Sequence, residues 1–346
     1  MSSPFRSSMA QSHSPMPAKI AKALVISIGD LSDFVQTLPA AKMIRDYHLG
    51  ARITLLTTES FRAFATACPW FDVVEVDPRA RDPQALAQMI ARIRAGKFDA
   101  IYDLTGDQRT NGYYLGLRPW PPKWSGVAPG CSHPHTAADR DGMHALDRLA
   151  DQLHEAGLGP SEGFAPFSAP PADFSWVRAA LRDPPRLRPE YFNIRPPHVV
   201  LFAAAAEVGG GRWPAASFIA LCKGVLARAV TPVVIGAGPE REIGAAIQRA
   251  VPQARVLISR ADLFQVISLC QTATAAFGMV GGPLHLAAAA GAPVVVLTPP
   301  GLSAQHLPRG ANVVLCLTAP DPAAAPAADV ERALGNVGAY SRSTVG

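Results

Sequence analysis

The chain has 346 residues, which is long enough for two ordinary domains with sizeable cores. Apolar residues make up 49% and charged residues 17%, a balance that excludes an intrinsically disordered chain. The net charge of +5 is mild and comes with no dense run of Lys or Arg. The composition therefore argues against nucleic acid as a partner, while it fits an acidic ligand or an anionic membrane surface.

Three features bear on the compartment, on a possible tail and on a possible membrane segment. The five cysteines are scattered without a CxxC pair, which predicts reduced thiols in a cytosolic protein and no structural zinc. Residues 1–18 are rich in Ser, Met and Pro and lack the apolar core of a signal peptide, so we expect a disordered tail. The span 263–308 contains no Asp, Glu, Lys or Arg. Because Gly and Pro interrupt it, it predicts a buried αβ unit rather than a membrane helix.

The N-terminal half alternates strand and helix patterns. The expected strands are 23–28, 52–57, 73–76 and 100–104, and the expected helices are 34–47, 59–67, 83–94 and 143–156. Residues 118–136 are rich in Pro, Trp and Gly, and they predict an irregular segment near a cleft. Strands that alternate with helices at this spacing indicate a parallel sheet.

A second alternation follows a Pro- and Arg-rich stretch that contains one short helix near 174–181. The expected strands are 199–204, 232–235, 254–257, 275–277, 294–297 and 313–317, and the expected helices are 215–227, 241–250, 263–272, 283–290 and 329–334. The fold class is therefore α/β, with two Rossmann-like domains facing a cleft. The predicted divisions are a tail over 1–18, domains over 19–185 and 199–335, a linker over 186–198 and a tail over 336–346.

One stretch near the C-terminus carries a ligand signal. Gly278, Gly281 and Gly282 lead into a helix whose first turn starts with Pro283, and His285 follows one turn in. A glycine turn before a helix leaves backbone N–H groups free beside the positive end of the helix dipole, which is an anion site that usually takes phosphate. Plain packing is the alternative interpretation of such a turn.

Ordered blocks along the chain resemble the heptosyltransferase family, glycosyltransferase family 9. These blocks are ALVISIGDLSDFVQTLPA, FDAIYDLTG, residues 143–158, RWP and GMVGGPLHLAAAAGAP, and they span about 19–317. The resemblance implies the glycosyltransferase B fold, with an acceptor domain over 19–185 and a nucleotide-sugar donor domain over 199–335. It also implies inverting, metal-independent transfer of a heptose or related sugar from an ADP-activated donor to the inner core of lipopolysaccharide, with no cofactor.

The resemblance assigns the catalytic base to Asp33, which stands before the apolar pair and T-L-P. Such a base takes the proton from the acceptor hydroxyl. The alternative role for Ser32 or Asp33 is the N-cap of the following helix. Asp30 is a rival carboxylate on the same turn, and Ser32 stands where the family often has Gly. Asp30 and Ser32 are therefore supporting candidates.

On the donor side, the resemblance assigns the diphosphate to Gly281, Gly282 and His285. Arg212 is the candidate phosphate contact and Glu240 the candidate acceptor from the ribose hydroxyls. The alternatives are a buried core histidine, an exposed loop arginine and a carboxylate that stabilises a helix start.

One departure from the family pattern concerns Val280, where the family commonly has Asp before Ser-Gly or Thr-Gly. A second hypothesis is therefore a catalytically impaired relative that binds nucleotide or glycan. A nucleotide-sugar epimerase is a third reading, but it needs further acid and base residues that the sequence does not locate. Asp139-Arg140-Asp141 imitates a metal-binding D-x-D in a polar loop, and we expect no metal there. The expected partners are a nucleotide-sugar and a lipopolysaccharide-core or other glycolipid acceptor, with no nucleic acid, in the cytoplasm with peripheral contact to the inner membrane.

Overall fold

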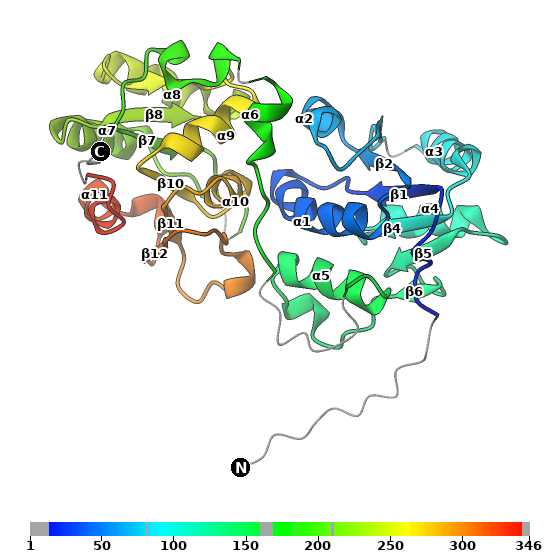
Figure 1. Cartoon of the computed structure of the whole chain (residues 1–346). Helices are drawn as coiled ribbons and strands as arrows, with labels where there is room; N and C mark the ends of the chain where they lie inside the picture. The colour runs from blue at the N-terminus through cyan, green and yellow to red at the C-terminus, as the bar shows by residue number, and fades with distance from the viewer. Residues whose placement is uncertain (1–13, 81, 160–168, 183, 209–210, 341–346) are drawn as a thin grey trace.

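Two α/β domains lie side by side in the computed structural model, and each is built on a six-stranded parallel sheet (Figure 1). The structure describes residues 14–80, 82–159, 169–182, 184–208 and 211–340. The predicted α/β class with two Rossmann-like domains is confirmed.

The first sheet has the strand order β3-β2-β1-β4-β5-β6. Its strands are β1 (Lys22–Ile26), β2 (Arg52–Thr57), β3 (Val73–Val76), β4 (Ala100–Asp103), β5 (Lys123–Gly126) and β6 (His133–Pro134). The helices of this domain are α1 (Leu31–Tyr47), α2 (Arg62–Ala67), α3 (Pro83–Gly96), α4 (Gln108–Leu117) and α5 (Ala145–Glu155).

Side chains of β1 explain why both faces of this sheet are covered. Ala23 and Val25 point to one face, where they join a core with α1 and α5, while Leu24 and Ile26 point to the other face, where they join a core with α3 and α4. Successive side chains of a strand alternate between the two faces, so a strand covered by helices on both sides is apolar throughout.

The second sheet has the strand order β12-β11-β10-β7-β8-β9. Its strands are β7 (His198–Phe202), β8 (Thr231–Ile235), β9 (Arg255–Val256), β10 (Ala275–Met279), β11 (Val294–Thr298) and β12 (Val314–Thr318). Its helices are α7 (Ala215–Ala227), α8 (Arg241–Ala250), α9 (Leu263–Thr272), α10 (Gly282–Ala289) and α11 (Ala327–Asn336).

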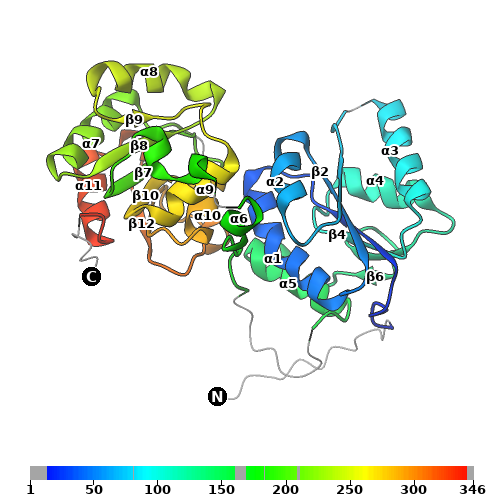
Figure 2. The ribbon, with the colours of Figure 1, turned by 45° about the horizontal axis from the view of Figure 1, so that its top comes forward.

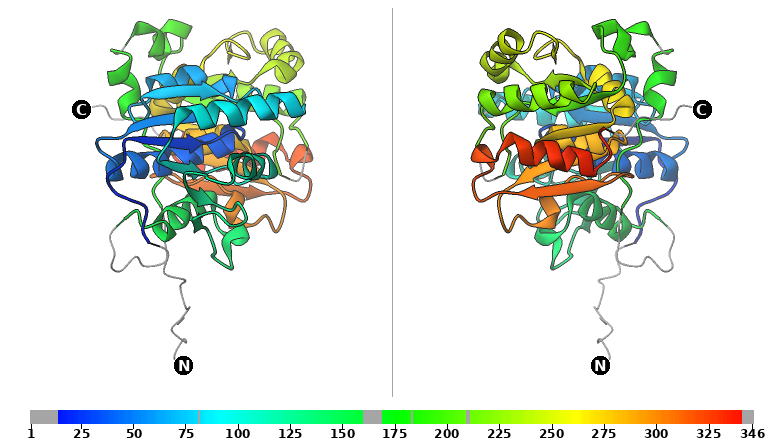
Figure 3. Two further views of the ribbon diagram at one scale, coloured as in Figure 1. Left: turned by 90° about the vertical axis from the view of Figure 1, so that its right-hand side faces the viewer. Right: turned by 90° about the vertical axis from the view of Figure 1, so that its left-hand side faces the viewer.

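The two domains share one apolar core on the side where they meet. Buried residues of α1 and α2 belong to the same cluster as buried residues of α9 and α10, and α1 packs directly on α10 (Figure 2). The short helix α6 (Trp176–Ala180) lies between the domains, where Trp176 contacts the rings of Phe64 and Trp70 and Arg178 donates to Ser268. Seen end-on, one domain covers the other (Figure 3).

One expectation about an irregular segment is wrong, and both predicted tails include packed residues. Residues 118–136 contribute β5 and β6 to the first sheet, because Trp124 is fully buried there although K-W-S-G lacks a β-branched pattern. Residues 14–18 belong to the packed structure, since the Met16 N–H donates to the Ala156 carbonyl at 2.8 Å and Met16 is 1% exposed. Ala339, predicted to lie in a tail, is buried. Residues 1–13 and 341–346 lie outside the described residues.

The remaining predicted domain limits stay predictions. The expected linker 186–198 packs on the second domain, with Leu187 and Ile194 buried and Arg186 paired with Asp262 at 2.6 Å. Its last residue, His198, is the first residue of β7.

All five cysteines are free. Cys68, Cys131, Cys222 and Cys270 are buried and Cys316, on β12, is exposed. Within the described ranges, no helix combines the length and the apolar character needed to cross a membrane.

Candidate active site

The cavity between the two domains brings together four of the eight predicted site residues, Ser32, Asp33, Gly281 and His285. It has a volume of about 280 Å³ and lies where the first turns of α1 and α10 meet. Its lining residues come from both domains and are Ser32, Asp33, Gln36, Asp141, Met143, Ala145, Arg148, Glu207, Val208, Val280, Gly281, His285, Gln305 and His306. We call this space the interdomain cavity.

The first turn of α1 is held by two carboxylates. The Asp30 carboxylate accepts the N–H of Asp33 at 3.1 Å, and the Asp33 carboxylate accepts the N–H of Asp30 at 3.4 Å, which is a capping box. The predicted cap, Ser32 or Asp33, is therefore wrong, because the helix begins three residues earlier than expected and Asp30 caps it. Asp33 takes part in this box and also lines the interdomain cavity.

The surroundings of Asp33 raise its pKa above the ordinary value. Burial among both domains raises its pKa, and the nearby Asp30 charge raises it further, although Asp33 keeps an exposed edge toward the cavity. The Asp30 N–H, Arg148 and Arg79 act in the opposite direction. A carboxylate with a raised pKa is a stronger base than an ordinary one.

The first turn of α10 already holds an anion, which the sequence does not predict. Glu207 accepts the N–H of Gly282 through Oε1 at 2.7 Å, and its own N–H donates to the Val280 carbonyl at 3.0 Å. The expectation that the Gly282 N–H is free for phosphate is therefore wrong in this structure. Burial, followed by the charges of Asp30 and Asp33, raises the pKa of Glu207. No spacing rule could have linked residues 207 and 282.

Gly282 is a point of close contact between the domains. A Cβ atom at this position would lie 2.7 Å from the Ser32 nitrogen and 2.8 Å from the Leu31 Cβ. Only a residue without a side chain lets the starts of α1 and α10 approach so closely. Gly282 therefore positions the base opposite the predicted donor side.

His285 lines the interdomain cavity but is a neutral group. It is 5% exposed, and burial lowers its pKa to about 4, with a smaller contribution from His144, whose ring centroid is 6.2 Å away. The neutral imidazole brings no positive charge, and in this structure its one N–H donates to the His306 carbonyl.

Arg212 and Glu240 contact each other and do not belong to the lining of the interdomain cavity. The guanidinium Nη2 of Arg212 lies 2.9 Å from Glu240 Oε1, and Nη1 donates to the Pro239 carbonyl. Glu240 is 5% exposed and also accepts the N–H of Ala237 at 2.8 Å. The structure thus places both residues at one edge of the second sheet, after β7 and β8, and their roles toward a nucleotide stay predictions.

One cavity residue on α5, Arg148, and one interdomain contact at the start of α5, His144, were missed from the sequence. Arg148 is half-buried and lines the cavity, and burial, followed by the charge of Arg140, lowers its pKa although it remains a cation. His144 caps α5 by accepting the Leu146 N–H, and its Nε2 lies 3.0 Å from the Leu307 carbonyl of the second domain. The signal for Arg148 was only its place on an amphipathic helix.

The two domains are also joined by an ion pair below the cavity. Arg309 contacts both carboxylate oxygens of Asp147, at 2.6 and 2.7 Å. Burial alone would raise the pKa of Asp147, but the hydrogen bonds from Arg309 outweigh it and hold the pKa below its ordinary value. A bidentate pair of this kind fixes orientation as well as distance.

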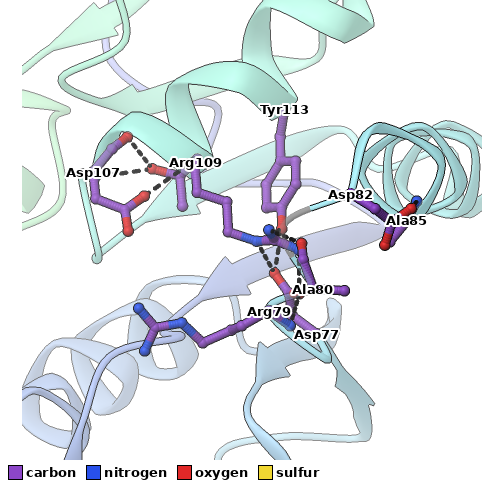
Figure 4. Close-up of polar contacts among 9 residues, drawn as sticks. Asp77, Arg79, Ala80, Asp82, Ala85, Asp107, Arg109 and Tyr113 are labelled. Carbon is purple, nitrogen blue, oxygen red and sulfur yellow. Dashed lines mark hydrogen bonds and ion pairs between the residues drawn. The ribbon is translucent and has the colours of Figure 1, made fainter.

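A second cavity of about 730 Å³ lies in the first domain, between the loops that follow β3 and β4. Figure 4 shows its polar centre, in which Arg109 contacts both oxygens of Asp77 at 2.7 and 2.9 Å and Tyr113 donates to the same carboxylate. Burial would raise the pKa of Asp77, but these contacts hold it below its ordinary value. Arg79 extends away from this cluster and acts on the charge of Asp33.

The sequence Asp139-Arg140-Asp141, which imitates a metal-binding motif, has another structural role. Asp139 precedes the short 3-10 helix η2 (Arg140–Gly142), and Arg140 pairs with Asp141 at 2.9 Å. Among the residues that the structure describes, no group of three or more His, Cys, Asp or Glu side chains is close enough to hold a metal ion.

The sequence pattern of glycosyltransferase family 9 (heptosyltransferase) matches residues 168–327, from before α6 to the start of α11. The match covers 160 of the 346 residues, most of them in the second domain. The resemblance drawn from the sequence is confirmed by this match. A curated relative from Haemophilus influenzae, described as a putative glycosyltransferase, is 30% identical over 80 residues, and this match spans 23% of each protein.

Solved structures extend the similarity to the whole fold. A family 9 glycosyl transferase from Veillonella parvula has a TM-score of 0.69 at 17% identity, covering 92% of this chain and 97% of that one. The ADP-heptose lps heptosyltransferase II of E. coli has a TM-score of 0.70 at 16% identity, covering 91% and 98%. An E. coli heptosyltransferase solved with ADP has a TM-score of 0.67 at 15% identity, covering 91% and 99%. These solved structures show that the chain shares its two-domain fold with members of this family.

Proposed function

We propose that the protein is an inverting glycosyltransferase that moves a heptose or related sugar from an ADP-activated donor to the inner core of lipopolysaccharide. The observation that carries this proposal is the meeting of Asp33, on the first domain, with the start of α10, on the second, across one cavity. The family 9 match of the second domain supports a heptose donor.

The chemistry assigns one step to each side of the cavity. Asp33 takes the proton of the acceptor hydroxyl. A lone pair of that hydroxyl oxygen then attacks the anomeric carbon of the donor sugar. The bond from that carbon to the diphosphate oxygen breaks on the opposite face, which inverts the configuration. Arg148 lies in the same cavity and offsets negative charge near the base. The step uses no metal.

The donor binds mainly to the second domain in this proposal. Gly281 and His285 contact the diphosphate. The Arg212–Glu240 pair separates, so that Arg212 contacts a phosphate and Glu240 accepts from the ribose hydroxyls. Glu207 must leave the Gly282 N–H if the diphosphate uses that group, because both are anions. The acceptor binds to the first domain near the second cavity, where Arg79 and Arg109 would suit an acidic saccharide. The proposed setting is the cytoplasm, at the inner membrane.

A catalytically impaired module that binds nucleotide or glycan is the second candidate. Two observations favour it: Val280 carries no carboxylate, and Glu207 occupies the helix start. The two candidates differ in turnover and agree in binding.

Calorimetric titration with ADP, followed by an assay of ADP release from ADP-heptose with a lipopolysaccharide-core acceptor, separates them. The transferase predicts ADP binding that weakens in Arg212→Ala and persists in Asp33→Ala, with ADP release lost in the latter. Binding without release in the wild type would favour the module. No binding of ADP, UDP or GDP compounds would overturn the donor site itself.

A further inference from the structure

Exposed apolar side chains gather at the end of the first domain that faces away from the second domain. Among the described residues, five large hydrophobic side chains are exposed. Two, Tyr191 and Val313, are isolated, and the other three are Leu49 (81%), Leu115 (51%) and Trp120 (88%). Single exposed hydrophobics are ordinary, but a group at one end of a domain points to an interaction.

The topology of the first sheet places these three residues on a common edge. Leu49 lies between α1 and β2, Leu115 lies in the last turn of α4, and Trp120 lies between α4 and β5. In a parallel sheet all strands start at the same edge, opposite the strand ends that face the interdomain cavity. The loop between α4 and β5 is at the far end of the first domain in Figures 1 and 2, and the left panel of Figure 3 looks onto that end.

Basic residues stand at the start of three strands along this edge. The first residues of β2 and β1, Arg52 and Lys22, are paired, and Lys123 starts β5, whose partner β4 pairs with β1 one residue further on. Neighbouring strands are about 4.8 Å apart, so these cations form a row about 15 Å long. Three more exposed cations lie beside the row: Arg94, Lys97 and Arg118.

This end of the domain is strongly positive. None of the six cations forms an ion pair with another described residue, whereas the nearby carboxylates of Asp46 and Asp72 are paired with Lys42 and Arg45. Asp99 is the opposing charge at the edge, and its carboxylate accepts the N–H groups of Ala21 and Lys22. We define the outer edge as Lys22, Leu49, Arg52, Arg94, Lys97, Leu115, Arg118, Trp120 and Lys123.

The segment around Trp120 is built to present the ring. The sequence Arg118-Pro-Trp120-Pro-Pro-Lys123 gives the ring a Pro on each side and a cation at each end. The Arg118 guanidinium lies over the Tyr114 ring and donates to the Pro129 carbonyl, which fixes the start of the segment. Trp beside Lys and Arg is the composition that favours the boundary between lipid headgroups and acyl chains.

We propose that the outer edge docks the protein on an anionic phospholipid surface, with Trp120 inserted at the interface and the six cations on the headgroups. Long basic side chains can cover apolar surface while their charges reach the phosphates. The proposal gives the peripheral contact of the proposed function a location, and its test does not depend on transferase activity.

Vesicle binding tests the outer edge directly. Full-length protein is sedimented with vesicles of phosphatidylcholine alone and of phosphatidylcholine with 30% phosphatidylglycerol, at low and high salt. Expected is binding to the anionic vesicles only, lost at high salt because the attraction is screened. Trp120→Ala and Lys123→Glu should each weaken the partition roughly tenfold. Tyr191→Ala and Arg249→Glu, equivalent exposed changes elsewhere, should leave it unchanged.

Fluorescence shows which residue inserts. Of the five tryptophans, Trp70, Trp124 and Trp213 are buried and Trp176 is partly buried, so Trp120 supplies most of the emission that a soluble quencher can reach. Anionic vesicles should protect this emission from acrylamide in the wild type and not in Trp120→Ala. Equal binding by Trp120→Ala, binding to neutral vesicles at high salt, or binding to an oligonucleotide in place of vesicles would overturn the proposal. ADP binding that persists in such a case would leave the proposed function standing.

Discussion

The first turns of α1 and α10 meet at the same cavity, yet their exposed N–H groups are satisfied in opposite ways. α1 supplies its own carboxylates, Asp30 and Asp33, three residues apart. α10 begins with Gly281, Gly282 and Pro283, which carry no capping side chain, and takes the Glu207 carboxylate from the loop after β7. A helix start that lacks its own cap can exchange one anion for another, whereas a self-capped start cannot. We therefore expect α1 to supply the base and α10 to supply the exchangeable anion site.

The largest effect should come from the self-capped side. Asp33→Asn keeps an oxygen that can accept the Asp30 N–H but removes the base, so kcat should fall about a hundred- to ten-thousandfold. Initial rates of ADP release measure this, and calorimetry should show unchanged ADP affinity. A kcat within threefold of the wild type would remove Asp33 from the reaction, and a loss of ADP affinity would make α1 part of the donor site.

The contact between the two helices should respond next. Gly282→Ala places a methyl group against the Ser32 nitrogen, and overpacking of this kind costs about 1–3 kcal/mol of unfolding free energy. Thermal unfolding should therefore shift down, and the rate of sugar transfer should fall because the base moves away from the donor side. Gly291→Ala is not a suitable control, since that glycine has a φ of 92°. Gly142→Ala is suitable, because no atom lies within 4 Å of the added carbon.

The exchangeable side should give a gain. Glu207→Gln removes a charge from the start of α10, and a charge there is worth enough to strengthen ADP binding by about two- to fivefold. Calorimetric titration with ADP measures the change, and Glu242→Gln, an exposed carboxylate in the first turn of α8, is the matched control. Weaker binding in Glu207→Gln would show that this carboxylate belongs to the donor site instead of competing with the donor.

The smallest effect concerns protons at α10. His285 should titrate near pH 4, well below the ordinary value of 6.5, because it is buried. Between these two values the unfolded chain binds more protons at this residue than the folded chain, so its contribution to stability is complete above pH 6.5 and falls toward pH 4. Imidazole NMR signals followed against pH report the midpoint. A midpoint near pH 6.5 would mean that the His285 imidazole is partly protonated near neutral pH and brings positive charge to the diphosphate.

Local sequence patterns were enough to predict the fold and about half of the residues of the interdomain cavity that belong to the candidate site. The strand and helix patterns of the second domain were readable because each apolar run has the length and punctuation of one element, and α7, α8 and α9 have the predicted bounds. The turn that carries Asp33 was also predicted from the sequence. Its N-cap was not, because Asp30 and Asp33 lie within one helical turn of each other. Elements with mixed composition, such as α4 and β5, were missed because burial in the sheet outweighs their weak patterns.

Contacts between distant segments were beyond the sequence. Glu207 and Gly282 are 75 residues apart, and nothing in either motif signals their hydrogen bond. Arg212 and Glu240 were each predicted to contact the nucleotide, and the structure shows that they contact each other, 28 residues apart. Arg148 lines the cavity only because α5 packs on α1. Contacts between such side chains can be predicted only when the packing of the helices and strands is already known.

The exposed thiol of Cys316 makes the second domain convenient to observe. The other four cysteines are buried, and burial raises the pKa of the Cys68, Cys222 and Cys270 thiols to about 12, so these groups stay protonated and unreactive at neutral pH. A maleimide dye should therefore attach at one position, on β12, without any substitution. With one dye on Cys316 and a second dye introduced on the first domain, the distance between the two domains could be measured across the cavity.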